Sequence, residues 1–304
     1  MILHRLESHL STLKVTSLKS IATSCGIGVA GSKLELLNRL NTHFKDLVNI
    51  GTDFGSTSTL DKDRLLPKSI LSFDLGYRNF AFVQLTKEYE IKEWQVTDFG
   101  FGSDHIDYHP SIIAPNIRQF LCDNVQPLFP QVDHIIVERQ RARSGSSFSI
   151  FEHTLRVNTV ESFLWCMLYE FNSTLTEKNN DQQQQQPFSV PMSPLLKQNI
   201  DKLWYDDLLS EWKIHALKQK RNTNNESTLT TIHSKMKLTT HEKKLASTLL
   251  VYRWLDQLYI KCPSHLKNMF YNKDKQDDLS DCLIQGVTWY QWRNNAINHL
   301  MEYV

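Results

Sequence analysis

Three runs of apolar and β-branched residues between positions 69 and 99 predict the start of a sheet. The segments SILSFDLG, FAFVQLT and IKEWQVTDF each have strand length and are joined by short polar connections, which permits an antiparallel three-stranded meander. A helical stretch around Ile112 to Leu128, the apolar strand HIIVE and a long amphipathic segment from about Ser149 to Phe171 follow. This order indicates an α/β domain, a mixed sheet with helices packed on its faces.

The rest of the chain is predicted to be mostly helical after one polar, low-complexity segment. Residues 172–187 read NSTLTEKNNDQQQQQP, a composition that cannot bury a core, so we expect a flexible loop there. The following segment PFSVPMSP is a possible further strand, and the chain then turns helical, ending in DDLSDCLIQGVTWYQWRNN. We therefore assign residues 68–304 to one α/β domain with an insertion near 172–187.

Residues 16–44 predict two short helices around a turn. Thr16 or Ser17 can begin the first helix and Gly26 can end it, whereas Ser32 and Glu35 form the S-x-x-E capping box of the second. The expected apolar face of the second helix consists of Leu34, Leu37 and Leu40. We expect a helical module over residues 1–48 and, because GTDFGSTSTLDKD lacks any periodicity, a linker over 49–67.

The stretch LKSIATSCGIGVAGSKLELLNRL resembles a SAP module, a helix-extended-helix element that binds DNA. The resemblance places the turn that contains Gly31 and Lys33 against DNA, with Arg39 as a weaker candidate. The alternative is a helical hairpin that only docks on the main domain.

Composition excludes several classes of protein. The chain has 304 residues, 40% hydrophobic and 22% charged, and lacks an apolar run of the roughly 20 residues needed to cross a bilayer, so no membrane span is expected. The five cysteines are widely spaced and form no CxxC pair, which indicates neither a zinc site nor a disulfide framework. The amino terminus MILHRLESHLST resembles neither a signal peptide nor a transit peptide.

The net charge is only +1, but basic residues gather between positions 213 and 244. This segment has a local excess of six positive charges, enough to neutralise phosphates, although it could equally be a solvated surface loop. Its basic residues are Lys213, Lys218, Lys220, Arg221, Lys235, Lys237, Lys243 and Lys244, and its acids are Glu226 and Glu242.

Acidic residues stand at three positions that suit metal or phosphate chemistry. Asp74 lies inside the first strand with small neighbours on its face, and Glu138 ends the strand HIIVE, where functional groups of open α/β sheets gather. Each acid could instead have a purely structural role, because Asp74 could flank a turn and Glu138 could pair with surface arginines.

A cluster of three aspartates, Asp277, Asp278 and Asp281, opens the last long helix. Asp278 and Asp281 lie about 60° apart on the helix surface, and Asp277 and Asp281 about 40°. The opposite, core-facing side of this helix is expected to be formed by Leu279, Cys282, Leu283, Gly286, Val287 and Tyr290. Taken alone, these acids could simply cap the helix and complement its dipole.

Together the acids form the order D…E…DxxD, which suits two divalent cations about 4 Å apart acting on a phosphodiester. Oxygen ligands without a His/Cys set favour Mg²⁺, with Mn²⁺ as a possible substitute, over zinc. No small-molecule cofactor is indicated.

The motifs DLGYRNFA, VERQRARSG and KQDDLSDCL, in this order, resemble the fungal mitochondrial Holliday junction resolvases, which are related to bacterial RuvC. The resemblance covers roughly residues 68–304. It implies an RNase H-like fold with a mixed five-stranded sheet flanked by helices, and a mitochondrial homodimer that resolves four-way DNA junctions by nicking two opposing strands symmetrically.

The resemblance also assigns roles to single residues. Asp74, Glu138, Asp278 and Asp281 would be the metal-binding acids, and Asp277 competes with Asp278 for its place. The residues expected to contact DNA near the scissile phosphates are Arg78, Arg139, Gln140, Arg141 and Arg143, and Lys197 is a further candidate for stabilising phosphate charge. Two other functions remain open: an RNase H-like nuclease that cleaves RNA or an RNA–DNA hybrid, and a DNA-binding protein without catalysis.

Overall fold

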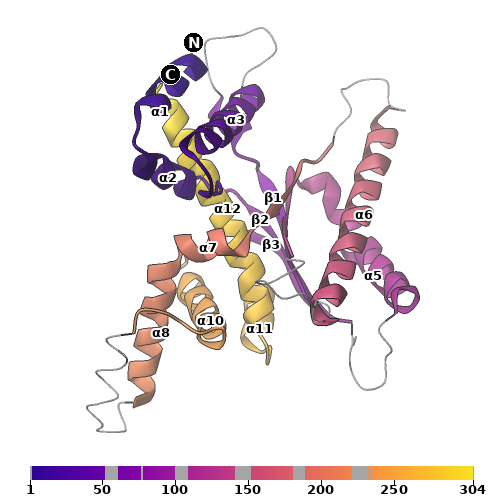
Figure 1. Cartoon of the computed structure of the whole chain (residues 1–304). Coiled ribbons are helices and arrows are strands. Elements are labelled where there is room, and N and C mark those ends of the chain that lie inside the picture. Colours follow the sequence, from indigo (N-terminus) through magenta and orange to yellow (C-terminus); the bar gives the residue numbers. More distant parts are fainter. Residues whose placement is uncertain are drawn as a thin grey trace.

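A mixed five-stranded sheet forms the centre of the protein, as seen in the computed structural model (Figure 1). The structure describes residues 2–51, 61–76, 78–99, 109–140, 152–180, 189–220, 232 and 235–303. The strand order is β3-β2-β1-β4-β5, in which β1, β2 and β3 form an antiparallel meander and β1, β4 and β5 run parallel. The strands are β1 (Ser69–Leu75), β2 (Asn79–Thr86), β3 (Ile91–Asp98), β4 (His134–Glu138) and β5 (Met192–Leu195). The predicted α/β sheet is thus confirmed.

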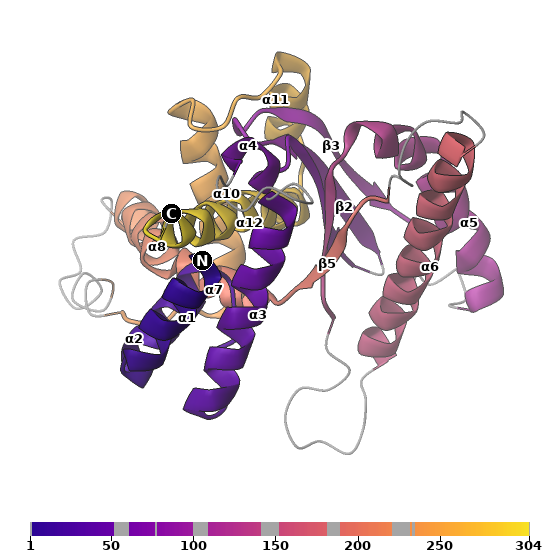
Figure 2. The same ribbon diagram turned by 90° about the horizontal axis from the view of Figure 1, so that it is seen from above.

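Helices cover both faces of this sheet (Figure 2). One face carries α5 (Pro110–Asn124), the 3₁₀ helix η1 (Gln126–Gln131) and α6 (Glu152–Asn180). The other is crossed by α12 (Asp277–Met301), behind which lie α7 (Lys197–Leu203), α8 (Tyr205–Lys220), α10 (Thr240–Asp256) and α11 (Ser264–Tyr271). Within the described residues, no helix has a stretch long and apolar enough to cross a membrane.

The alternation of side chains along β1 separates two hydrophobic cores. Phe73 points into the core beneath α5 and α6, together with Phe80 and Phe82 of β2. Ile70 points the other way, into the core beneath α12. Asp74 is one residue from Phe73 and therefore lies on the α12 face of the sheet.

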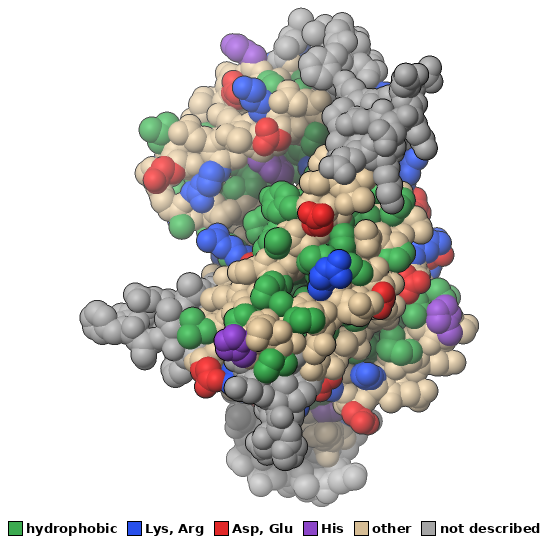
Figure 3. All heavy atoms as spheres, turned by 90° about the vertical axis from the view of Figure 1, so that its right-hand side faces the viewer, with side chains coloured by type: hydrophobic (Ala, Val, Ile, Leu, Met, Phe, Trp, Pro, Cys, Tyr) green, Lys and Arg blue, Asp and Glu red, His purple; other side chains and the backbone are tan. Residues whose placement is uncertain are grey.

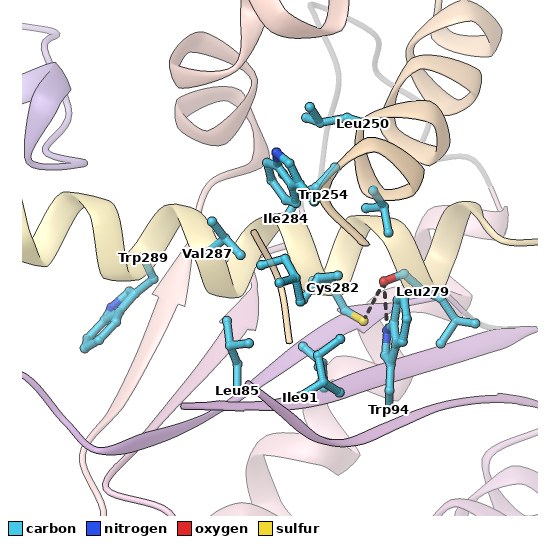
Figure 4. Close-up of a cluster of buried hydrophobic side chains, with 14 of the residues drawn as sticks. Leu85, Ile91, Trp94, Leu250, Trp254, Leu279, Cys282, Ile284, Val287 and Trp289 are labelled. Atoms are coloured by element: carbon cyan, nitrogen blue, oxygen red, sulfur yellow. Dashed lines mark hydrogen bonds between the residues drawn. The ribbon is translucent and has the colours of Figure 1, made fainter. Parts of the chain in front are cut away.

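Helix α12 lies unusually close to the sheet because Gly286 has no side chain. A Cβ atom added there would stand 3.3 Å from Leu85 Cδ2 and 3.5 Å from Ser72 Cβ. Figure 4 shows the apolar residues of α12, including Val287, between the sheet and the side chains of α10. The expected core-facing side of this helix is confirmed, since Leu279, Cys282, Leu283, Gly286, Val287 and Tyr290 are all buried.

The N-terminal module consists of α1 (Ile2–Thr12), α2 (Val15–Ser24) and α3 (Lys33–Gly51), and it packs on the C-terminal half of α12. Gly26, at φ +73°, ends α2 with its Cα against the Trp292 ring, where a Cβ would come within 2.4 Å. Two amides fix this turn: Asn295 Nδ2 donates to the Ser24 carbonyl (2.8 Å) and Asn199 Nδ2 to the Gly26 carbonyl (3.3 Å). The module is therefore docked on the main domain.

Several details of the module differ from the sequence-based expectation. Helix α1 was not expected, and α2 begins at Val15 after Lys14, so neither Thr16 nor Ser17 caps it. The capping box is present, because Ser32 N donates to Glu35 Oε2 at 2.7 Å. The buried face of α3 consists of Leu36, Leu40, Phe44 and Leu47, whereas Leu34 is 67% exposed.

The expected linker and insertion are both more helical than their composition indicates. Helix α3 continues to Gly51, and α4 (Lys62–Leu65) buries Leu65 in the core of the module. Helix α6 continues through residues 172–180, where a loop was expected, and residues 181–187 of the expected insertion lie outside the described residues. Asn172 is buried there and exchanges hydrogen bonds with the backbone of Val190, which satisfies its polar side chain inside the fold.

A half-buried arginine of α12, Arg293, joins this helix to the module. Arg293 stacks over the Trp289 ring at 5.7 Å and its Nε donates to the Leu65 carbonyl at 2.8 Å. Burial, and then the charge of Arg293, lower the pKa of His43 on α3 to about 4. His43 is therefore uncharged in the folded protein at neutral pH.

This neutral imidazole makes the stability depend on pH. The unfolded chain takes up a proton at His43 below about pH 6.5, whereas the folded chain does so only near pH 4. The free energy of unfolding should therefore fall by roughly 1–3 kcal/mol as the pH falls through this window. Urea unfolding at pH 7 and pH 4 measures this loss, and His43→Gln should reduce it. The exposed His4→Gln serves as the control, and an equal loss in both variants would contradict the assignment.

Candidate functional site

Two acids lie side by side at the carboxyl ends of β1 and β4. The parallel register pairs Phe73 with Val137, so the next residues along each strand, Asp74 and Glu138, are neighbours. Both point to the α12 face, because Ile70 and Ile136 on the same alternation belong to the core beneath α12. Their carboxyl groups are within hydrogen-bonding reach of each other.

Three hydrogen bonds fix the start of α12 above this edge. Trp94 Nε1 donates to the Leu279 carbonyl at 3.1 Å, which Figure 4 shows as a dashed line. Ser72 Oγ donates to the Cys282 carbonyl at 2.7 Å, and Gln285 Nε2 donates to the Phe73 carbonyl at 3.1 Å. Asp281 lies between these anchors, so its position relative to the strands is set by buried bonds.

Asp281 completes a cluster of three carboxylates, which we call the acidic triad: Asp74, Glu138 and Asp281. Lys197, the first residue of α7, lies among them. Its ammonium group is ion-paired with Asp281 Oδ2 and lies 3.9 Å from Glu138 Oε2. The sequence separates these four residues by up to 207 positions, and the fold brings them together.

The triad holds more negative charge than its surroundings compensate. Burial, followed by the charge of Glu138, raises the pKa of Asp74 well above its usual range, and Asp281 adds to this effect. Lys197 acts in the opposite direction. Mutual repulsion of this kind is typical of carboxylates that share a cation or a proton.

Asp277 and Asp278 stand apart from the triad and have their own lysines. Lys244 Nζ lies 2.6 Å from Asp277 Oδ2, and Lys275 Nζ lies 3.2 Å from Asp278 Oδ2. Burial alone would raise the pKa of Asp277, but the hydrogen bond from Lys244 lowers it. Burial, and then the charge of Asp277, raise the pKa of Asp278. Neither aspartate is preferred as a fourth ligand by these contacts.

The donor set of the triad suits a hard divalent cation. Oxygen ligands with excess negative charge are the ligands that Mg²⁺ and Mn²⁺ prefer. With Lys197 among them, no three acidic, histidine or cysteine side chains of the described segments are arranged to hold a metal ion. Positive charge is supplied instead by the lysine.

Besides Lys197, four of the residues expected to contact DNA belong to the described part of the chain. Arg78 and Arg139 are exposed, and Gln140 Nε2 donates to the Leu75 carbonyl at 3.4 Å. Arg139 and Gln140 line a pocket of about 390 Å³ that Lys197 also borders. Lys33 is exposed on the module and donates to the Ser11 carbonyl. Arg141 and Arg143 lie outside the described residues.

Sequence reasoning missed one acid near the triad. Glu161 of α6 faces the end of β4. Burial raises its pKa above the usual value, against the opposing effect of hydrogen bonds with the Trp165 side chain and the Gln140 backbone. No local signal marks this residue, because it lies within a long amphipathic helix.

Three lysines of the basic segment pair with acids in the part of the chain that the structure describes. Lys235 pairs with Glu242, Lys243 with Asp201 and Lys244 with Asp277, each at 2.6 Å. Arg221 and Glu226 lie outside the described residues. The expected excess of positive charge therefore does not translate into an equal number of free cations.

Comparison with known proteins agrees with this architecture. The chain is 25% identical over 295 residues to the mitochondrial cruciform cutting endonuclease 1 of Schizosaccharomyces pombe. The aligned region covers 93% of this chain and 94% of that protein. It also resembles the crystal structure of the yeast mitochondrial Holliday junction resolvase Ydc2, with a TM-score of 0.56 at 21% identity, over 96% of this chain and 100% of that one. The latter likeness confirms the fold.

A family model described as mitochondrial resolvase Ydc2 / RNA splicing MRS1 matches residues 70–298. This range includes all five strands except the first residue of β1, the acidic triad, Lys197 and nearly all of α12. The chain therefore belongs to the mitochondrial resolvase Ydc2 / RNA splicing MRS1 family.

Proposed function

We propose that this protein is a metal-dependent endonuclease that resolves four-way DNA junctions in mitochondria. The observation that carries the proposal is the convergence of Asp74, Glu138 and Asp281 around the ammonium group of Lys197. The relatives supply the substrate class: one is named a cruciform cutting endonuclease and another a Holliday junction resolvase, both mitochondrial.

The acidic triad would hold Mg²⁺, or Mn²⁺ in its place, and Asp277 or Asp278 would assist from the next turn of α12. The bound ions would activate a water molecule and stabilise the leaving oxygen of the phosphodiester. Burial on the α12 face keeps the Asp74 carboxylate oriented. Arg139 and Gln140 border the pocket beside the triad and would hold the flanking phosphates. Arg78, Arg141 and Arg143 would extend this contact, and Lys33 would bind DNA from the module.

Symmetric nicking of a junction requires two active sites, so we include a homodimer in the proposal. Figure 3 shows hydrophobic side chains gathered across the face that carries α5 and α6. Its exposed apolar residues include Ile112, Leu155 and Tyr169, which are 43%, 50% and 61% exposed. A surface of this kind supports association with a second copy.

A second candidate follows from the family itself, whose description includes RNA splicing. A member of this kind could bind structured RNA without cleaving it, or cleave RNA or an RNA–DNA hybrid. The intact triad favours a nuclease over a binding protein, because buried and mutually repelling carboxylates are costly unless they serve a site.

The first prediction from this proposed function concerns substrate choice. With Mg²⁺, the protein should nick synthetic four-way junctions at least about 100-fold faster than a duplex of matched sequence, and chelation should abolish cleavage. Gel analysis of junction, duplex, hybrid and RNA substrates measures this preference. Equal rates on junction and duplex would contradict junction resolution, and faster cleavage of the hybrid would favour the alternative.

The second prediction concerns Asp74→Asn. It should abolish cleavage while leaving junction binding intact, because it removes one charged ligand at almost constant volume. It should also stabilise the metal-free protein by roughly 0.5–2 kcal/mol, since a repelled buried charge is lost. Band-shift assays and urea unfolding measure the two effects. The exposed Asp98→Asn is the control, and retained cleavage in Asp74→Asn would rule out the site.

The third prediction concerns the dimer. The double variant Leu155→Glu/Tyr169→Glu should shift the protein from dimer to monomer, because charges are costly in an apolar interface. Light scattering across a concentration series measures the mass. Ile214→Glu on α8, where the apolar side chain is 44% exposed, is the control. A wild-type chain that is monomeric while nicking both strands in concert would contradict the dimer.

A further inference from the structure

Lys197 occupies the position where the acidic triad concentrates negative charge. Its ammonium group contacts Asp281 and lies 3.9 Å from Glu138. The charge of Asp74 also acts on it. With all three carboxyl groups ionised, the triad and the lysine would carry a net charge of −2, so the lysine would compensate one third of the negative charge.

A divalent cation bound by the same oxygens would stand within a few ångströms of this ammonium group. Two positive charges at that distance repel strongly in a partly buried site. The carboxylate oxygens that now face Lys197 would also be needed as ligands. The ion pairs of Lys197 and a cation held by the triad are therefore mutually exclusive.

Lys197 reaches the triad from the end of a helix, with part of its side chain in solvent. It is the first residue of α7, its side chain is 46% exposed, and it has a long flexible stem. The same residue borders the 390 Å³ pocket that is also lined by Arg139, Gln140 and Asn158. The lining also includes the carboxylates of Glu138, a member of the triad, and Asp201, which is already paired with Lys243 at 2.6 Å. A released ammonium group can turn into this pocket, where it would join Arg139 in offering positive charge to a phosphate.

We propose that Lys197 is a displaceable counter-ion of the acidic triad: it neutralises the carboxylates before a divalent cation binds, and on binding it moves into the adjoining pocket to contact a substrate phosphate. This inference rests on the proposed metal-dependent function and adds a competition that the function alone does not require. Metal loading and phosphate contact become coupled steps, because one side chain takes part in both.

The competition sets an expected effect on metal affinity. In the wild-type chain part of the binding free energy is spent on displacing the lysine, so the apparent affinity is reduced by the population in which Lys197 is bound to the triad. Lys197→Met keeps the length of the stem and removes the charge. It should bind Mn²⁺ about tenfold more tightly at pH 8 and should lower the melting temperature of the metal-free protein.

Isothermal calorimetry with Mn²⁺ on the full chain, without DNA, tests this directly. Lys197→Arg retains the charge and should stay within about twofold of the wild type. Lys92→Met is the matched control, because Lys92 forms a 2.6 Å pair with Glu90 and is 47% exposed, far from the triad on β3. It should leave Mn²⁺ binding unchanged. If Lys197→Met fails to fold, Lys197→Gln replaces it.

The outcomes separate this inference from the proposed function. Absence of Mn²⁺ binding by the wild-type chain would overturn the metal-dependent function itself. Normal wild-type binding together with equal or weaker binding by Lys197→Met would overturn only the counter-ion role.

The movement into the pocket has its own readout. With Ca²⁺ in place of Mg²⁺, so that DNA is not consumed, the salt dependence of junction binding should decrease by about one phosphate contact in Lys197→Met. Without a divalent cation the slopes of variant and wild type should agree, because the lysine is then engaged by the triad. Equal slopes under both conditions would overturn the relocation.

Discussion

The fixed crossing of α12 over the sheet is the constraint on which the site depends. Close approach at Gly286 and the buried bonds from Ser72, Trp94 and Gln285 hold the start of the helix against β1. Asp281 is thereby held beside two acids that belong to parallel neighbouring strands. The carboxylates repel one another, and the surrounding core supplies the free energy that keeps them together.

The parts of the fold that depend on local periodicity could be predicted from the sequence. Alternation in SILSFDLG placed Asp74 on a face with small neighbours, and the helical period of the last segment separated its aspartates from its apolar side. Both features depend on residues a few positions apart. They carry over to the structure because they are properties of a single element.

The features of the fold and the site that could not be predicted depend on contacts between residues far apart in the sequence. The helical continuation through Asn172 relies on its bonds to Val190, and composition alone favours a loop there. The division of the aspartates into a triad member and two residues paired with Lys244 and Lys275 cannot be read from spacing. The counter-ion position of Lys197 is likewise invisible until α7 is folded against α12. The acidic partners of Lys243 and Lys244 lie outside the basic segment, so its charge count could not show these pairs.

Helix α12 also serves the opposite end of the molecule. Its first two turns carry the aspartates, and its last turns place Ala296, Ile297 and Leu300 in the core of the N-terminal module. Each added or deleted residue would rotate one end by about 100° relative to the other. The number of residues between Asp281 and Ala296 is therefore fixed, because Asp281 must face the other acids of the triad while Ala296 faces the core of the N-terminal module.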